Sequence, residues 1–142
     1  MNIKGGVAIV TGSATGIGAE TAKLLAKKGC RVVVNYSRSR DEAEVTAGEC
    51  RAHGVDVLVH QADIADDAQC RGMAKAAIER WGRIDALVNC AGKTKPAKPG
   101  DLEALNGPDF LEIYAVNVVG TYQMIRAVVP TMKSQGNGAI VN

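Results

Sequence analysis

The sequence has no apolar run that approaches the roughly 20 residues of a membrane-spanning helix. Its 17 basic and 15 acidic side chains leave a formal net charge of only +2, which is too small to indicate binding to nucleic acid or to an acidic membrane surface. No signal peptide separates Met1 from the first predicted strand at Val7. We therefore expect a cytoplasmic protein of one globular domain, residues 1–142, with neither nucleic acid nor membrane as a partner.

The four cysteines form no pattern typical of a metal site or a disulfide framework. Cys30, Cys50, Cys70 and Cys90 include no Cys-x-x-Cys pair, and no histidine lies near them at ligand spacing. The sequence thus predicts no metal site and four reduced thiols in a reducing compartment.

A Gly-Lys-Ser/Thr sequence is also missing after the first glycine-rich turn, which excludes a P-loop. The turn itself is present: the apolar run Val7–Val10 predicts a buried strand, and Gly12, Gly16 and Gly18 follow it before a helical pattern begins. A strand, a glycine turn and a helix in this order direct unpaired backbone N–H groups and the positive end of the helix dipole to one point, where an anion can bind. A tight turn without any ligand is the alternative.

Strand and helix patterns alternate along the rest of the chain without a linker. The first helix carries Ile17, Thr21, Leu24 and Leu25 on one face and ends at Gly29. Further strands are predicted at 31–36, 55–60, 84–88 and from 139, and further helices at 39–53, 66–81 (capped by Asp66) and 109–133. This alternation predicts a Rossmann-type, doubly wound α/β fold: a parallel sheet with helices on both faces.

The predicted helix 109–133 is apolar over most of its circumference. A helix of this kind is buried or packs against another subunit. Pro130 should disturb its last turns. We expect this helix to contact a partner copy of the chain.

Three motifs resemble those of the amino-terminal part of short-chain dehydrogenases/reductases, in the order and spacing of that family. They are Thr11-Gly12-x-x-x-Gly16-Ile17-Gly18, Asn89-Cys90-Ala91-Gly92 and Asn117-Val118-Val119-Gly120. Within the family, the chain is most similar to bacterial 3-oxoacyl-acyl-carrier-protein reductases. The resemblance implies hydride transfer between a nicotinamide cofactor and a ketone or secondary alcohol, possibly reduction of a 3-oxoacyl thioester, by a homo-dimer or homo-tetramer.

The resemblance also implies roles for particular residues. The cofactor pyrophosphate and adenosine ribose would be held by the glycine turn: Gly12, Ser13, Thr15, Gly16, Ile17 and Gly18. Asp63 and Ile64 would lie against the adenine, although Asp63 also fits a turn that leads into a helix. Asn89, Ala91 and Gly92 would back the nicotinamide ribose. Asn117 would bend the long helix and anchor a water of a proton relay; a helical asparagine satisfied by a neighbouring backbone group is the alternative.

The catalytic serine and the Tyr-x-x-x-Lys of the family are absent from these 142 residues. Tyr36, Tyr114 and Tyr122 do not replace them, because Arg40, Val118 and Arg126 stand four positions later. The family's sheet would therefore be truncated after the fifth strand. Two hypotheses follow: the residues are part of an NAD(P)-dependent oxidoreductase, or they form a dinucleotide-binding module without catalysis, such as an inactive truncated fragment.

The end of the second strand indicates which cofactor is preferred. An NAD site needs a carboxylate about 20 residues beyond the glycine turn, but no acid occurs between Glu20 and Asp41. The residues in that place are Asn35, Tyr36, Ser37 and Arg38. A guanidinium and a hydroxyl favour a 2′-phosphate, so we expect NADP(H), with NAD(H) as a possible second cofactor. Arg38 as a solvated loop residue is the alternative, and Thr15 stands where many NADP-using members carry a basic residue.

Overall fold

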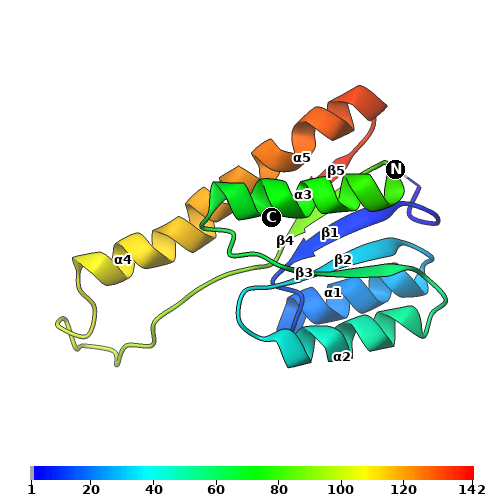
Figure 1. Ribbon diagram of the computed structural model, residues 1–142. Coiled ribbons are helices and arrows are strands. Elements are labelled where there is room, and N and C mark those ends of the chain that lie inside the picture. Colours follow the sequence, from blue (N-terminus) through cyan, green and yellow to red (C-terminus); the bar gives the residue numbers. More distant parts are fainter. Residues whose placement is uncertain (1) are drawn as a thin grey trace.

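A computed structural model describes residues 2–142 as five parallel strands with helices on both faces of the sheet (Figure 1). The strands run in the spatial order β3-β2-β1-β4-β5. Their bounds are Val7–Thr11 (β1), Arg31–Tyr36 (β2), Val57–Gln61 (β3), Ala86–Asn89 (β4) and Ala139–Val141 (β5). The helices are α1 (Gly16–Lys27), α2 (Arg40–Arg51), α3 (Asp67–Trp81), α4 (Gly107–Tyr114) and α5 (Thr121–Gln135), with the π-helical segment η1 (Ala115–Gly120) between the last two. The predicted doubly wound α/β fold is confirmed.

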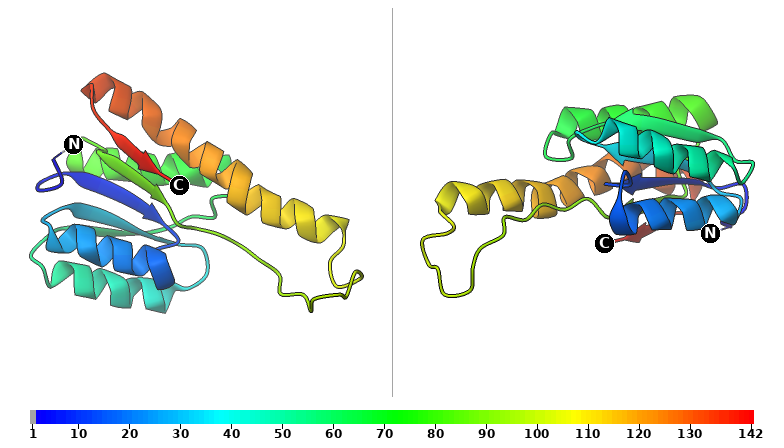
Figure 2. Two further views of the ribbon diagram at one scale, coloured as in Figure 1. Left: turned by 180° about the vertical axis from the view of Figure 1, so that it is seen from behind. Right: turned by 90° about the horizontal axis from the view of Figure 1, so that it is seen from below.

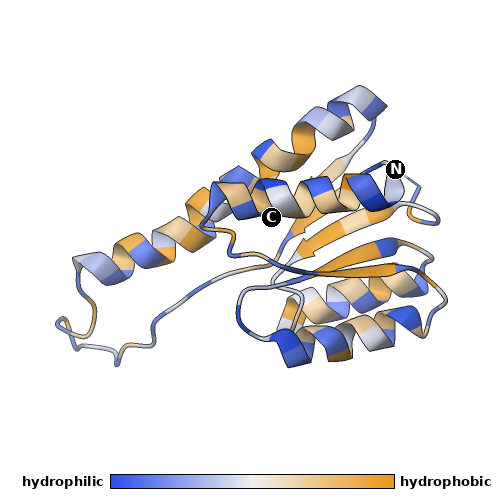
Figure 3. Ribbon diagram, in the orientation of Figure 1, coloured by the Kyte–Doolittle hydropathy of each residue, from blue (hydrophilic) through white to orange (hydrophobic). Residues whose placement is uncertain are grey.

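The core consists of two layers, one on each face of the sheet. Helices α1 and α2 cover one face, and α3 and α5 cover the other (Figure 2). Alternate residues of β1 face opposite layers, so Ala8 and Val10 pack under α1 and α2 while Ile9 packs under α3 and α5. Burial on both faces explains the continuous apolar runs 7–10 in β1 and 32–34 in β2. The sheet is accordingly orange over much of its area in Figure 3.

The buried face of α1 is different from the apolar face that the sequence suggests. Ile17 is 81% exposed and Leu24 is 59% exposed. Small residues face the sheet instead: Gly18, Ala19, Ala22 and Ala26. Short side chains let the helix axis approach the strands closely, and this proximity outweighs the larger apolar area that the leucine and isoleucine would bury.

The predicted helix 109–133 has different bounds and is not a uniform α-helix. It begins at Gly107, where Asn106 and Asp109 form a capping box, and continues past Pro130 to Gln135. The π-helical segment interrupts it at 115–120 and adds a residue to the turn. Gly120, at the end of that segment, packs so closely against Ile64 that a β-carbon would lie 2.8 Å from the Ile64 side chain.

The first half of this long helix extends beyond the sheet (Figure 1). No residue of α4 is buried. Large side chains of α4 and the start of α5 are exposed: Phe110, Leu111, Tyr114 and Tyr122. Only the later part packs on the sheet, through Met124, Val128 and Met132. None of the helices in residues 2–142 is long and apolar enough to cross a membrane.

A buried carboxylate joins β1 to the start of β4. Asp85 is 1% exposed; its Oδ2 accepts a hydrogen bond from the Val7 N–H at 2.9 Å, and the Arg83 guanidinium donates to both of its oxygens. Burial alone raises the pKa of Asp85, but Arg83 and the Val7 N–H together bring it below the usual value.

We predict that Asp85→Asn lowers the free energy of unfolding by about 1–3 kcal/mol at pH 7, because the Val7 N–H and Arg83 lose a charged acceptor. The folded-state pKa is lowered, so this stabilisation is complete above the unfolded pKa of about 4 and disappears as the pH falls through the folded value. Urea unfolding between pH 7 and pH 3 should show the variant and wild type converging at low pH. Glu103→Gln, in an exposed turn, is the control and should follow wild type throughout; a constant Asp85→Asn deficit would contradict the assignment.

Candidate functional site

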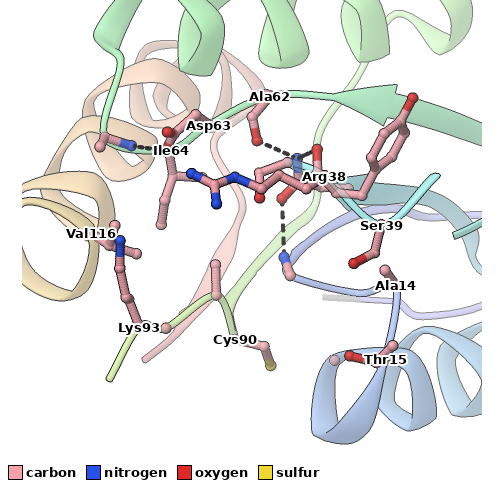
Figure 4. Close-up of a pocket in the computed structure, with 18 of the residues that line it drawn as sticks. Ala14, Thr15, Arg38, Ser39, Ala62, Asp63, Ile64, Cys90, Lys93 and Val116 are labelled. Carbon is pink, nitrogen blue, oxygen red and sulfur yellow. Dashed lines mark hydrogen bonds between the residues drawn. The ribbon is translucent and has the colours of Figure 1, made fainter. Parts of the chain in front are cut away.

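A cavity of about 580 Å³ lies at the carboxyl edge of the sheet. The glycine loop after β1, the turn after β2, the turn after β3 and the loop after β4 all line it (Figure 4). The residues of α4 and η1 that border it are Glu112, Ala115 and Val116. Ligands of open α/β sheets bind at this edge, so the cavity is the candidate site.

The glycine loop can adopt its path only with glycine at two positions. Gly12 has φ +61°, and a β-carbon there would lie 2.7 Å from the Cα of Ala91. A β-carbon on Gly18 would lie 2.5 Å from the carbonyl oxygen of Gly12. Contacts this short do not occur in real structures, so the loop is packed backbone against backbone, both with itself and with the loop after β4.

The N-terminus of α1 has no cap of its own. Thr15 is the N-cap residue, but its side chain forms no capping hydrogen bond, and the first turn contains no acidic residue. Gly16 (φ +59°) has open space where a β-carbon would be. The first N–H groups and the positive end of the helix therefore point into an accessible region, which suits a phosphate group.

The side chains of Ser13 and Asn35 are buried and bonded within the protein, although Asn35 borders the cavity. Ser13 is fully buried; its hydroxyl donates to the Val10 carbonyl and accepts from the Asn35 N–H. The Asn35 side chain accepts from the Gly12 N–H. Both side chains are thus engaged by the protein, and the Ser13 N–H donates to the Asn35 carbonyl. Neither the hydroxyl nor the N–H of Ser13 is therefore free to donate to a cofactor.

The turn after β2 presents Arg38 to the cavity. Tyr36 is nearly buried, whereas Ser37 and Arg38 are exposed. The side chain of Arg38 extends across the cavity towards Asp63 and Ile64 (Figure 4). Among residues 2–142, no carboxylate forms an ion pair with Arg38.

The turn after β3 contains Asp63 and Ile64, which the resemblance places against the adenine. Both border the cavity, but Asp63 also has the contacts of a residue in a turn that leads into a helix. The Asp63 carboxylate accepts from the Ala65 N–H at 2.9 Å, as a turn residue does. Ile64 is buried against α3 and α5 and borders the cavity. Asp66 accepts from the N–H groups of Ala68 and Gln69, which confirms the predicted cap of α3.

The loop after β4 is tied to β1 by one hydroxyl. Thr11 Oγ1 accepts from the N–H groups of Cys90 and Ala91, both at 3.1 Å. Asn89 donates to the side chain of Asn142, and its own Oδ1 is buried without a partner. Ala91 and Gly92 border the cavity, as the resemblance implies, and Cys90 does too.

Asn117 lies in the π-helical segment and pairs with the backbone of Lys93. Its Oδ1 accepts from the Lys93 N–H at 2.7 Å, and its Nδ2 donates to the Lys93 carbonyl at 2.9 Å. The alternative of a helical asparagine satisfied by a neighbouring backbone group therefore describes its contacts in this chain. The Lys93 side chain also pairs with Glu112, and Lys95 pairs with Asp109.

Sequence reasoning did not find Lys93, Glu112 and Val116 as cavity residues. The position of Lys93 directly after the Asn-Cys-Ala-Gly motif is a usable signal, because any residue there must leave the sheet edge beside the ligand. Glu112 and Val116 carry no such signal, since their placement depends on the path of the long helix. Within residues 2–142, no cluster of His, Cys, Asp or Glu side chains could hold a metal ion.

Comparison with known proteins connects this geometry to one family. Residues 6–142 match the family model described as short chain dehydrogenase. The chain belongs to the short-chain dehydrogenase/reductase family. Members of this family bind a nicotinamide dinucleotide.

Two relatives within the family carry the names of reductases of ketoacyl (3-oxoacyl) groups. The chain is 42% identical over 96% of its length to a ketoacyl reductase assigned to the granaticin polyketide synthase of Streptomyces violaceoruber. It is 36% identical over 95% of its length to the 3-oxoacyl-[acyl-carrier-protein] reductase FabG of Staphylococcus epidermidis. The solved structure of an NAD⁺-bound xylitol dehydrogenase matches all of this chain with a TM-score of 0.91 at 28% identity. In each case the chain spans about half the length of the relative, namely 53%, 54% and 54%.

Proposed function

We propose that these residues form the dinucleotide-binding part of an NAD(P)-dependent oxidoreductase that transfers hydride between nicotinamide and a ketone or secondary alcohol. The observation that carries the proposal is the uncapped N-terminus of α1 behind a glycine loop that admits no side chain at Gly12 or Gly18. Two relatives named as reductases of 3-oxoacyl groups make a 3-oxoacyl thioester the first substrate class to test.

Different residues of the cavity would contact different parts of the dinucleotide. The α1 N-terminus would receive the pyrophosphate, and Ile64 would provide an apolar wall for the adenine. Ala91 and Gly92 would lie beside the nicotinamide ribose, with Lys93 and Val116 beyond them (Figure 4). Bound nicotinamide would accept or donate the hydride.

Arg38 supports a preference for NADP(H) over NAD(H). It is exposed, has no carboxylate partner among the described residues, and extends across the cavity (Figure 4). A planar guanidinium is well suited to a phosphate. Asp63, the carboxylate towards which Arg38 extends, accepts a hydrogen bond from the Ala65 N–H in the turn after β3.

The second hypothesis is a dinucleotide-binding module without catalysis. Among the tyrosines of these 142 residues, Tyr114 and Tyr122 are exposed and do not border the cavity. Tyr36 borders it, but Arg40 rather than a lysine stands four positions later. Without a positioned tyrosine and lysine, no strong general acid stands ready to protonate a carbonyl oxygen.

We predict that the 142-residue chain binds NADP⁺ in calorimetric titration but does not oxidise NADPH with 3-oxoacyl thioesters or simple ketones. Binding follows from the glycine loop, and the lack of turnover follows from the missing general acid. Absence of binding would argue against the proposed site. Turnover by the 142 residues alone would show that another group replaces the tyrosine.

Arg38→Ala should weaken NADP⁺ binding by about 1–3 kcal/mol, the range for hydrogen bonds to charged groups, and leave NAD⁺ binding nearly unchanged. Arg40→Ala, two residues later at the start of α2, is the matched control because Arg40 is exposed and does not border the cavity. Calorimetric titration with both nucleotides measures the effect. Equal losses for the two nucleotides, or a wild type that prefers NAD⁺, would refute the assignment.

The exposed side chains Phe110, Leu111, Tyr114 and Tyr122 support a homo-oligomer through α4 and the start of α5. We predict that the chain sediments as a dimer or tetramer and that the double variant Leu111→Asp/Tyr122→Asp shifts it towards monomer, since charges at these positions cannot be buried without a partner. Leu102→Asp is the control, because Leu102 is 89% exposed outside these helices. A wild type that remains monomeric at all concentrations would contradict the proposed homo-oligomer.

A further inference from the structure

The side chain of Asn35 connects three of the four strand ends that border the cavity, those of β1, β2 and β3. It is 2% exposed at the end of β2. Its Oδ1 accepts from the N–H of Gly12 in the glycine loop at 3.0 Å. Its Nδ2 has the carbonyl oxygen of Ala62, directly after β3, at 3.1 Å, and those of His60 and Tyr36 at 3.3 and 3.4 Å. The bond at Ala62 is visible as a dashed line in Figure 4.

The backbone of Asn35 strengthens the same connection. Its N–H donates to Ser13 Oγ at 2.9 Å, and its carbonyl accepts from the Ser13 N–H at 3.0 Å. Ser13 in turn donates to the Val10 carbonyl. The glycine loop is thus held to β2 by one main-chain bond and one bond to the Ser13 hydroxyl, and the side-chain amide of Asn35 adds the link to β3.

Only an amide satisfies all of these partners. The Gly12 N–H needs an acceptor, and the carbonyls beyond it need a donor. An aspartate would place a second oxygen against the carbonyl of Ala62. An alanine would leave the half-buried Gly12 N–H without the acceptor that fixes its position.

The position of Gly12 determines where the rest of the loop can lie. On its other side Gly12 is in contact with Ala91, and Gly18 packs on its carbonyl oxygen. Movement of Gly12 therefore displaces the first turn of α1, whose N–H groups face the cavity. The partners of the Asn35 amide do not include the turn at Arg38.

We propose that Asn35 is the positioning residue of the site: its side-chain amide fixes the glycine loop to β3 so that affinity for the part shared by NAD⁺ and NADP⁺ depends on it. This inference rests on the proposed dinucleotide-binding function. It assigns to Asn35 a role opposite to that of Arg38, because Asn35 affects both cofactors equally and Arg38 discriminates between them.

The test compares Asn35→Leu and Asn35→Ala with Val33→Ala in the same 142-residue chain, since a carboxylate at position 35 would by its charge disfavour a 2′-phosphate. Val33 is fully buried on β2 and packs in the layer under α3 and α5, away from the glycine loop. Its truncation lowers stability without touching Gly12. Each variant is titrated with NAD⁺ and with NADP⁺ well below its melting temperature.

Both Asn35 variants should lose affinity for the two nucleotides by the same factor, about 10- to 100-fold, with the ratio of the two dissociation constants unchanged. Val33→Ala should bind as wild type does. Wild-type affinity in either folded Asn35 variant, or a changed ratio, overturns the proposal; so does an equal loss in Val33→Ala, which would indicate a general effect of instability.

Amide hydrogen exchange tests the placement of the loop without any ligand. In Asn35→Ala the Gly12 N–H should exchange at least about 10-fold faster relative to the Val33 N–H of the same chain, and Val33→Ala should not show this at Gly12. Unchanged protection of Gly12 in Asn35→Ala overturns the proposal even if nucleotide affinity falls. If the wild type binds neither nucleotide, the proposed function fails, and exchange at Gly12 alone decides whether Asn35 positions the loop.

Discussion

The close approach of Gly12 to Ala91 is the contact on which the ligand edge of this fold depends. At 2.7 Å from the position of a β-carbon, the Ala91 Cα leaves room for a hydrogen atom only. Thr11 supports the approach, because its hydroxyl accepts two N–H groups from the loop after β4. With β1 and β4 joined in this way, the loop after β1 must turn away from β4, and the N-terminus of α1 is directed into the cavity.

The alternation of strands and helices was predictable because strands that are buried on both faces contain continuous apolar runs, as β1 and the middle of β2 do. The buried face of α1 was not. Ile17 and Leu24 suggest an apolar face by their size, yet Ala19, Ala22 and Ala26 face the sheet. Apolar periodicity does not distinguish a face that is buried from a face that is only apolar. Close packing selects the smaller side chains when a helix lies directly on the strands.

The same limit applies to the polar residues of the site. Polar residues stand at the ends of β1, β2 and β4, at the edge where the cavity lies. Their sequence positions do not tell whether a side chain faces the cavity or the protein. Asn35 and Ser13 are turned inward because the glycine turn leaves backbone N–H and carbonyl groups that require partners. The π-helical segment is similarly hidden in the sequence, since one added residue in a long apolar helix alters the pattern little. Its effect in space is large: it brings Asn117 to the backbone of Lys93 and Gly120 to Ile64.

The cavity thus has two parts that differ in how much stability a substitution costs: the buried glycine loop with Asn35, and the exposed turn after β2. Substitution at Gly12 or Asn35 leaves a clash or an unpaired buried group, each of which costs on the order of 1–3 kcal/mol before any ligand is considered. Substitution at Ser37 or Arg38 changes an exposed turn, where most replacements alter stability by about 0.5 kcal/mol or less. In the proposed binding mode, a change of preference between a 2′-phosphate and a 2′-hydroxyl would need substitutions only at the turn after β2 and would leave the glycine loop unaltered. This separation follows from burial: the groups that shape the loop are inside the sheet edge, whereas Ser37 and Arg38 are exposed outside it.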